Sequence, residues 1–208
     1  MLVVACIAAS TGCRLAYTGG AKPVNAAEVA ANDEMLHSAP TPAVKQVSRQ
    51  DCGVAALAIV AGAWGKQWSV VEMERTLKPT KAGLRLGTLR DFARHRGLDA
   101  YAIKGTFADL EHELRNGHPV LLGLVLPFDQ KNNLNHYEVA VAIDPRTHVV
   151  ITRDPATGGL MRREQKVLDL EWKTAGYATL VVVGSKENDH VEEIVGASDG
   201  PVRGDRLP

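Results

Sequence analysis

The chain has 208 residues, 45% of them hydrophobic and 5% aromatic, which suits one globular domain with appendages better than two full domains. Lys and Arg number 24 and Asp and Glu number 24, so the formal net charge at neutral pH is zero. Since no long run of one sign is present to follow phosphates or an anionic lipid surface, we expect no nucleic-acid partner.

The first segment has features of an export signal. Residues 1–12 are uncharged and rich in small and apolar side chains. They are too few to span a membrane as a helix, which takes about 20 residues, but suit a signal-peptide core. STGC then places Cys13 where a bacterial lipobox carries its lipidated cysteine, although Ser10 stands where Leu is usual and no Lys or Arg precedes it. The alternative is a weakly hydrophobic, frayed N-terminus.

The composition changes along the chain and predicts its organisation. We expect a lipoprotein-type signal peptide over residues 1–12 and a flexible tether over 13–42, which is rich in Ala, Pro, Asn and Gly. A compact unit follows over 43–184. The tail, 185–208, is polar and turn-rich, and we expect it to be disordered. Export and lipidation of Cys13 would place the protein in the cell envelope, anchored by lipid to a membrane and facing the periplasm or the exterior.

Helical signals dominate the first half of the compact unit. Asp51 is a candidate N-cap for an apolar helix ending near Gly62 or Gly65. Capping residues predict further helices over 69–78, where Ser69 and Glu72 form a capping box, and over 88–97. A strand over 99–105 and a helix over 107–117 come next.

Strand patterns dominate the second half. The run PVLLGLVLP at 119–127 is almost continuously apolar, which predicts a strand buried on both faces. Further strands are expected over 136–143, 148–154 and 177–184, with a short helix at 167–176 before the last. Helices first and an antiparallel sheet afterwards predict an α+β fold.

Cys52 follows the predicted N-cap directly. There the helix macrodipole and unpaired backbone N–H groups favour a thiolate. A free cysteine is also among the most frequently buried residues, so a packing role is the alternative. If the chain is exported, an unpaired thiol would lie where structural cysteines are normally paired. Together these features predict a nucleophile.

A thiolate nucleophile needs a base, and His136 is the best placed of seven histidines. A four-residue loop at 144–147 would pair Ile143 with His148 and set His136 opposite residue 155, one position from Asp154. Asp154 would then orient the imidazole, giving a Cys-His-Asp triad. The alternative is a surface His and Asp at a strand end. The other histidines lie in the tether, the tail, charged helices or loops: His37, His95, His112, His118, His148 and His190.

Four stretches in this order, QVSRQDCGVAALAIV, GHPVLL, NHYEVAV and RDP, resemble the papain-like cysteine peptidase domain of bacteriocin exporters, which cleaves double-glycine leader peptides. The resemblance implies the papain-like fold over about 43–184. It implies Cys52 as nucleophile, His136 as base, Asp154 as its orienting group, and Gln46 in the oxyanion hole. The Gln46 amide and the Cys52 backbone N–H are suitable donors for that role, and Gln50 is a nearer but less favoured candidate.

We therefore expect a thiol endopeptidase, free-standing rather than fused to a pump, that acts on an exported polypeptide outside the cytoplasmic membrane. It would need no metal and no organic cofactor. Its partners would be a peptide or protein substrate and a separate ABC-type exporter or secretion apparatus, with membrane contact only through the lipid anchor. The alternatives are a non-catalytic leader-binding or peptide-binding module and a papain-like acyl or peptidyl transferase.

Overall fold

A computed structural model describes residues 19–127 and 133–184. Within them an eight-stranded sheet runs in the order β1-β7-β6-β5-β4-β8-β3, with β2 paired to one end of β5. Each pair of neighbouring strands is antiparallel. The strands are β1 Lys22–Val24, β2 Leu36–His37, β3 Leu98–Lys104, β4 Val120–Pro127, β5 Asn133–Ile143, β6 Val150–Arg153, β7 Leu160–Arg163 and β8 Ala178–Gly184.

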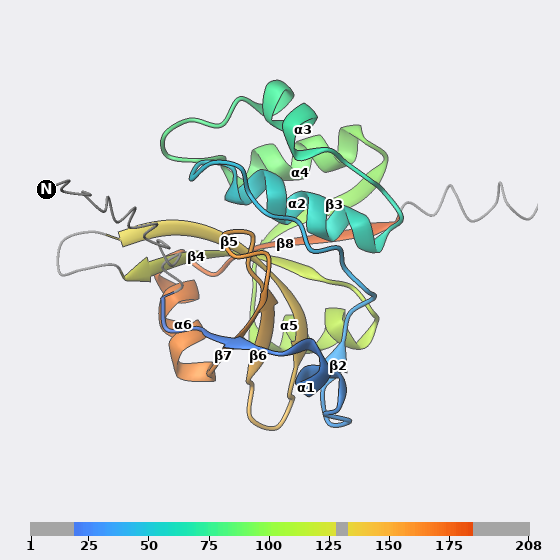
Figure 1. Ribbon diagram of the computed structural model, residues 1–208, viewed down its shortest axis with the longest axis vertical. Helices are drawn as coiled ribbons and strands as arrows, with labels where there is room; N and C mark the ends of the chain where they lie inside the picture. The colour runs from blue at the N-terminus through green and yellow to red at the C-terminus, as the bar shows by residue number, and fades with distance from the viewer. Residues whose placement is uncertain (1–18, 128–132, 185–208) are drawn as a thin grey trace, which may run out of the picture.

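The helices lie on both sides of the central strands (Figure 1), which explains the apolar runs. Because side chains alternate along a strand, Leu121 of β4 packs with one group of helices while Val120 and Leu122 pack with the other. α2, α3 and α4 lie above β4, β5 and β8 in the figure, and α5 and α6 below. The helices are α1 Ala26–Ala30, α2 Cys52–Ala63, α3 Val70–Leu77, α4 Leu86–His95, α5 Phe107–Arg115 and α6 Gln165–Thr174.

The predicted α+β class is confirmed, and most predicted elements are present. α2 begins directly after Asp51, and α3 begins after Ser69, although neither side chain forms the expected cap hydrogen bond. α4 begins earlier than predicted, with Arg85 rather than Thr88 at its N-cap. In α5 the capping box is complete, through Thr106 and the residue three positions later.

The expectation of a flexible tether over 13–42 is wrong for residues 19–42. β1 pairs with β7 at the edge of the sheet, and β2 pairs with Ala142 and Ile143 of β5. Between them, Val29 of α1 is buried against the sheet. These contacts join segments far apart in the sequence, so local composition did not reveal them. The rest of the predicted tether, the signal peptide with Cys13, and the tail at 185–208 lie outside the described residues.

The β5–β6 hairpin differs from its predicted register. Ile143 pairs with Val150 rather than with His148, and a bulge between Ala140 and Ala142 shifts the pairing again. His148 belongs to the turn: its φ is +51° and its N–H donates to the carbonyl of Asp144. The turn is therefore longer than expected. Among the described helices, none has the length and apolarity needed to cross a membrane.

Candidate active site

Cys52 is the first residue of α2, a helix buried along almost its whole length. Small side chains, mostly Ala and Gly, let this helix lie close to β4 and β5. The segment before it is fixed by Asp51, whose Oδ2 accepts a 2.7 Å hydrogen bond from the backbone N–H of Ser48. Cys52 is 5% exposed and forms no disulfide among the described residues. The thiol therefore has a fixed place at the positive end of a helix.

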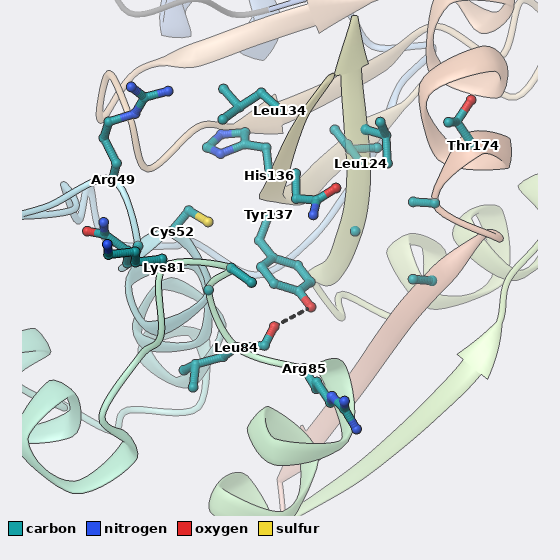
Figure 2. Close-up of a pocket in the computed structure, with 18 residues that line it drawn as sticks. Arg49, Cys52, Lys81, Leu84, Arg85, Leu124, Leu134, His136, Tyr137 and Thr174 are labelled. Carbon is teal, nitrogen blue, oxygen red and sulfur yellow. Dashed lines mark hydrogen bonds between the residues drawn. The ribbon is translucent and has the colours of Figure 1, made fainter. Parts of the chain in front are cut away.

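His136 and Asp154 form the predicted contact despite the altered register. Nε2 of His136 lies 2.7 Å from Oδ1 of Asp154, and the two side chains are 6% and 1% exposed. The turn after β6 holds this carboxylate, since its Oδ1 also accepts from the N–H of Ala156 and its Oδ2 from the hydroxyl of Thr157. With Nε2 engaged, Nδ1 is the nitrogen left for Cys52, which lies next to His136 in Figure 2.

The electrostatics of the pair favour a charged imidazole. Burial alone would lower the pKa of His136, but the hydrogen bond with Asp154, the contact with Cys52 and the charge of Glu138 outweigh it and raise the pKa to about 10. Burial by itself raises the pKa of the Asp154 carboxyl, yet the bond to His136 and the turn donors leave that pKa lowered. A thiol facing a stabilised imidazolium is the arrangement that activates a cysteine nucleophile.

Gln46 is tied to the same turn, because its backbone N–H donates to the carbonyl of Pro155 at 2.9 Å. One N–H of its side-chain amide donates to the carbonyl of Ser48, and its Oε1 is buried without a hydrogen-bond partner among the described residues. Gln50, the less favoured candidate, lines the pocket at Cys52 and accepts from the Ser48 hydroxyl. The oxyanion role of Gln46 stays a prediction.

A pocket of about 770 Å³ opens beside Cys52 and His136. Tyr137 stands on one side, and its hydroxyl donates a 2.9 Å hydrogen bond to the carbonyl of Leu84 (Figure 2). This bond joins β5 to the loop before α4. Among the described residues that line the pocket, the cationic side chains besides His136 are Arg49, Lys81 and Arg85, and none is Asp or Glu.

A buried charge network that sequence reasoning missed lies next to the triad. Glu138 sits on β5 two residues after His136, and its carboxylate pairs with Arg163 of β7. Ligand atoms of His136, Glu138 and Asp154 lie within 4.8 Å of one another, and these residue types can bind a metal ion. The guanidinium already supplies the positive charge there, which favours an ion-pair network. The signal in the sequence was a Glu inside the apolar strand HYEVAVAI.

Two further histidines, His118 and His148, are engaged by glutamates away from the pocket. Nδ1 of His118 contacts Glu113 at 2.8 Å, and its ring packs against Trp64. His148 contacts Glu111 and stacks on a phenylalanine of α5. Neither lines the pocket at Cys52. Only His136, among the described histidines, does so.

A thiol at a helix N-terminus, an imidazole bridged to a buried carboxylate, and an adjoining pocket define the chain as a cysteine peptidase. The chain belongs to the Peptidase C39 family, whose model matches residues 40–186. This confirms the family resemblance. Over 110 residues the chain is also 27% identical to the pediocin PA-1 transport/processing ATP-binding protein PedD of Pediococcus acidilactici. That match covers 53% of this chain but 14% of the transporter.

Solved structures share the fold. The peptidase domain of Streptococcus ComA, a bi-functional ABC transporter of a quorum-sensing pathway, aligns with a TM-score of 0.56 and 23% identity, covering 68% of this chain and 97% of that one. A double glycine motif protease from an AMS/PCAT transporter gives 0.58 and 19%, covering 72% and 95%. A C39-like peptidase from Bacillus anthracis gives 0.61 and 16%, covering 73% and 98%.

Proposed function

We propose that this chain is a thiol endopeptidase that cleaves an exported or secreted polypeptide after a small residue, such as the end of a Gly-Gly leader. Sγ of Cys52 attacks the scissile carbonyl, the amide C–N bond breaks, and His136 protonates the leaving amine. Water then hydrolyses the thioester with His136 as base, while Asp154 orients the ring. One observation carries the proposal: Nε2 of His136 lies 2.7 Å from Oδ1 of Asp154, and the same imidazole ring adjoins Cys52.

Two features support a small residue before the scissile bond. The solved relative from the AMS/PCAT transporter is a double glycine motif protease in complex with a leader peptide. In this chain the hydrogen bond between Tyr137 and Leu84 holds the pocket wall in place, so the wall resists displacement by a large side chain. The cationic lining residues, Arg49, Lys81 and Arg85, favour acidic residues in the same peptide.

We expect peptides with Gly or Ala before the scissile bond to be cleaved at least about tenfold faster than peptides with Leu or Phe there, because a poorly fitting side chain costs this much in a shaped pocket. Within the Gly set, Glu-flanked peptides should have a lower KM than Lys-flanked ones, and the difference should shrink with added salt. A peptide library read by mass spectrometry measures both.

Cys52→Ala protein is the blank for this library. Equal cleavage after Gly, Leu and Phe would contradict the small-residue preference, and equal KM values for Glu-flanked and Lys-flanked peptides would remove the charge preference. Adding a free amine to the assay separates hydrolysis from acyl or peptidyl transfer, because a transferase would yield the amide in place of the acid.

The proposal also places the enzyme outside the cytoplasmic membrane, lipid-anchored at Cys13 and acting beside a separate exporter or secretion apparatus. The support is in the sequence: a short uncharged segment followed by STGC. A single acyl chain generally binds a membrane only marginally. Stable anchoring takes a second signal, either another lipid chain or a patch of basic residues. The position of Cys13 therefore bears directly on where the enzyme meets its substrate.

Wild-type protein is expected in the membrane fraction of its host, whereas Cys13→Ala should be soluble or remain unprocessed, because the acceptor thiol is gone. Fractionation with immunoblotting, together with the mass of the mature N-terminus, measures this. Cys6→Ala is the matched control, since Cys6 lies within the predicted signal and should be removed. If wild type and Cys13→Ala partition identically, the lipid anchor does not exist.

A further inference from the structure

We propose that the carboxylate of Glu138, clamped by Arg163, is a positioning residue that acts with Asp154 to hold the charged ring of His136 toward Cys52. This role rests on the proposed function, in which His136 is the base. It adds a second anion behind the triad, one that has no part in the Cys-His-Asp scheme derived above.

Glu138 is placed to act on His136 by the geometry of β5. The two residues are two positions apart in a strand, so their side chains leave the same face. Oε1 of Glu138 lies 3.8 Å from Nε2 of His136. This is too long for a hydrogen bond but close enough for a strong charge interaction in a dry site. Nε2 of His136 thus faces two carboxylates, with Asp154 taking the hydrogen bond at 2.7 Å.

The carboxylate of Glu138 is fixed by its partners rather than by His136. Nη2 of Arg163 donates to its Oε1 at 2.5 Å, and Nε donates to its Oε2 at 2.9 Å, which is the bidentate arrangement. The hydroxyl of Thr152 donates to the same Oε2 at 2.5 Å. Glu138, Arg163 and Thr152 are all fully buried. The anion therefore cannot turn away from the histidine.

The carboxylates near His136 outnumber the one guanidinium that pairs with them. Arg163 of β7 also donates to Glu171 of α6, so one guanidinium serves two carboxylates. The Glu171 Oε1 is occupied by the backbone N–H of Gly20 at 2.9 Å. Because Asp154 adds another carboxylate on the side of the hairpin, the surroundings of His136 carry excess negative charge. Such surroundings favour an imidazolium over a neutral ring.

Glu138→Gln removes the charge and keeps the shape and one of the two acceptor oxygens. We expect kcat to fall about tenfold with KM changed less than about twofold, because ring orientation and charge are altered while the pocket is not. The basic limb of the pH profile of kcat/KM should move down by about one unit, since an opposite charge at this distance shifts a pKa by one to three. Alkylation of Cys52 at pH 6, where His136 is charged in both proteins, should slow about tenfold because the less firmly held ring stabilises the thiolate less; peptide mapping measures this.

Glu171→Gln is the matched control, because it removes the other buried carboxylate of the same guanidinium without removing Glu138 from His136. It should lower the melting temperature but shift the basic limb less than Glu138→Gln does. Equal shifts in both variants, or an unmoved limb in Glu138→Gln, would mean that the pair only supports the fold. If Glu138→Gln fails to fold, Glu138→Asp takes its place, because it keeps the charge but withdraws it by one methylene. It should move the basic limb of kcat/KM in the same direction by less. An unmoved limb overturns the proposal.

The alkylation measurement separates this inference from the proposed function. It needs no substrate, so it reports on the His136–Cys52 pair even if none of the peptides is cleaved. Slower alkylation of Cys52 in Glu138→Gln without any peptide cleavage by wild type would support the positioning role and refute the proposed small-residue substrate.

Discussion

Cys52→Ala is expected to abolish peptide cleavage, and His136→Ala to lower kcat by roughly 10⁵- to 10⁶-fold, because nucleophile and base act as one unit. Among the described residues Cys52 is the only cysteine, and it lines the pocket next to His136, so no other described thiol can replace it. The double variant should be no worse than Cys52→Ala, since effects within such a unit do not add. Single-turnover assays on the best library peptide measure these losses.

The controls are His118→Ala and His148→Ala. Both rings are engaged by glutamates away from the pocket, at 2.8 and 3.1 Å, so kcat should stay within about twofold of wild type. If either control loses activity as severely as His136→Ala, or if His136→Ala retains most of its turnover, the base has been assigned to the wrong residue.

Local patterns predicted the elements that carry the triad. An N-cap Asp before an apolar, small-residue run placed Cys52 at the start of α2, and the alternation of HYEVAVAI placed His136 in a strand. The hairpin prediction failed in detail, because a bulge and a longer turn cannot be counted from loop length alone. The hairpin prediction still identified Asp154 as the partner of His136, because a carboxylate directly after β6 can reach several positions on β5.

Long-range pairings were beyond local reasoning. β1 and β2 contain three and two residues, too short for an alternating pattern, and they exist because β7 and β5 offer partners distant in the sequence. β7 was missed for the same reason. The sequence shows Glu138 as a charged residue in the middle of an apolar strand. Its partner Arg163 lies 25 residues away, on a strand that was not predicted. Buried networks of this kind depend on tertiary structure.

Asp154→Asn is expected to lower kcat by up to about 10⁴-fold while leaving the fold intact, because an amide keeps the shape of the carboxylate but no longer fixes the tautomer or stabilises the imidazolium. The pKa of His136, about 10 in the folded protein against an ordinary value of 6.5, sets the sign of the pH dependence. Since the folded pKa is raised, the stabilisation from charged His136 is fully present below pH 6.5 and is lost as pH rises through about 10.

In the wild type, both the melting temperature and kcat/KM should therefore decline as the pH rises toward 10. In Asp154→Asn, the pKa of the basic limb of kcat/KM should be about one to three units lower. The melting temperature of this variant should depend less on pH over the same range. Asp144→Asn is the matched control, because Asp144 caps the turn of the same hairpin through the N–H groups of Arg146 and Thr147. Its loss should cost stability without moving the limb. A limb near pH 10 that survives in Asp154→Asn would show that some other group keeps His136 charged, and Glu138, 3.8 Å from Nε2, would be the first residue to test.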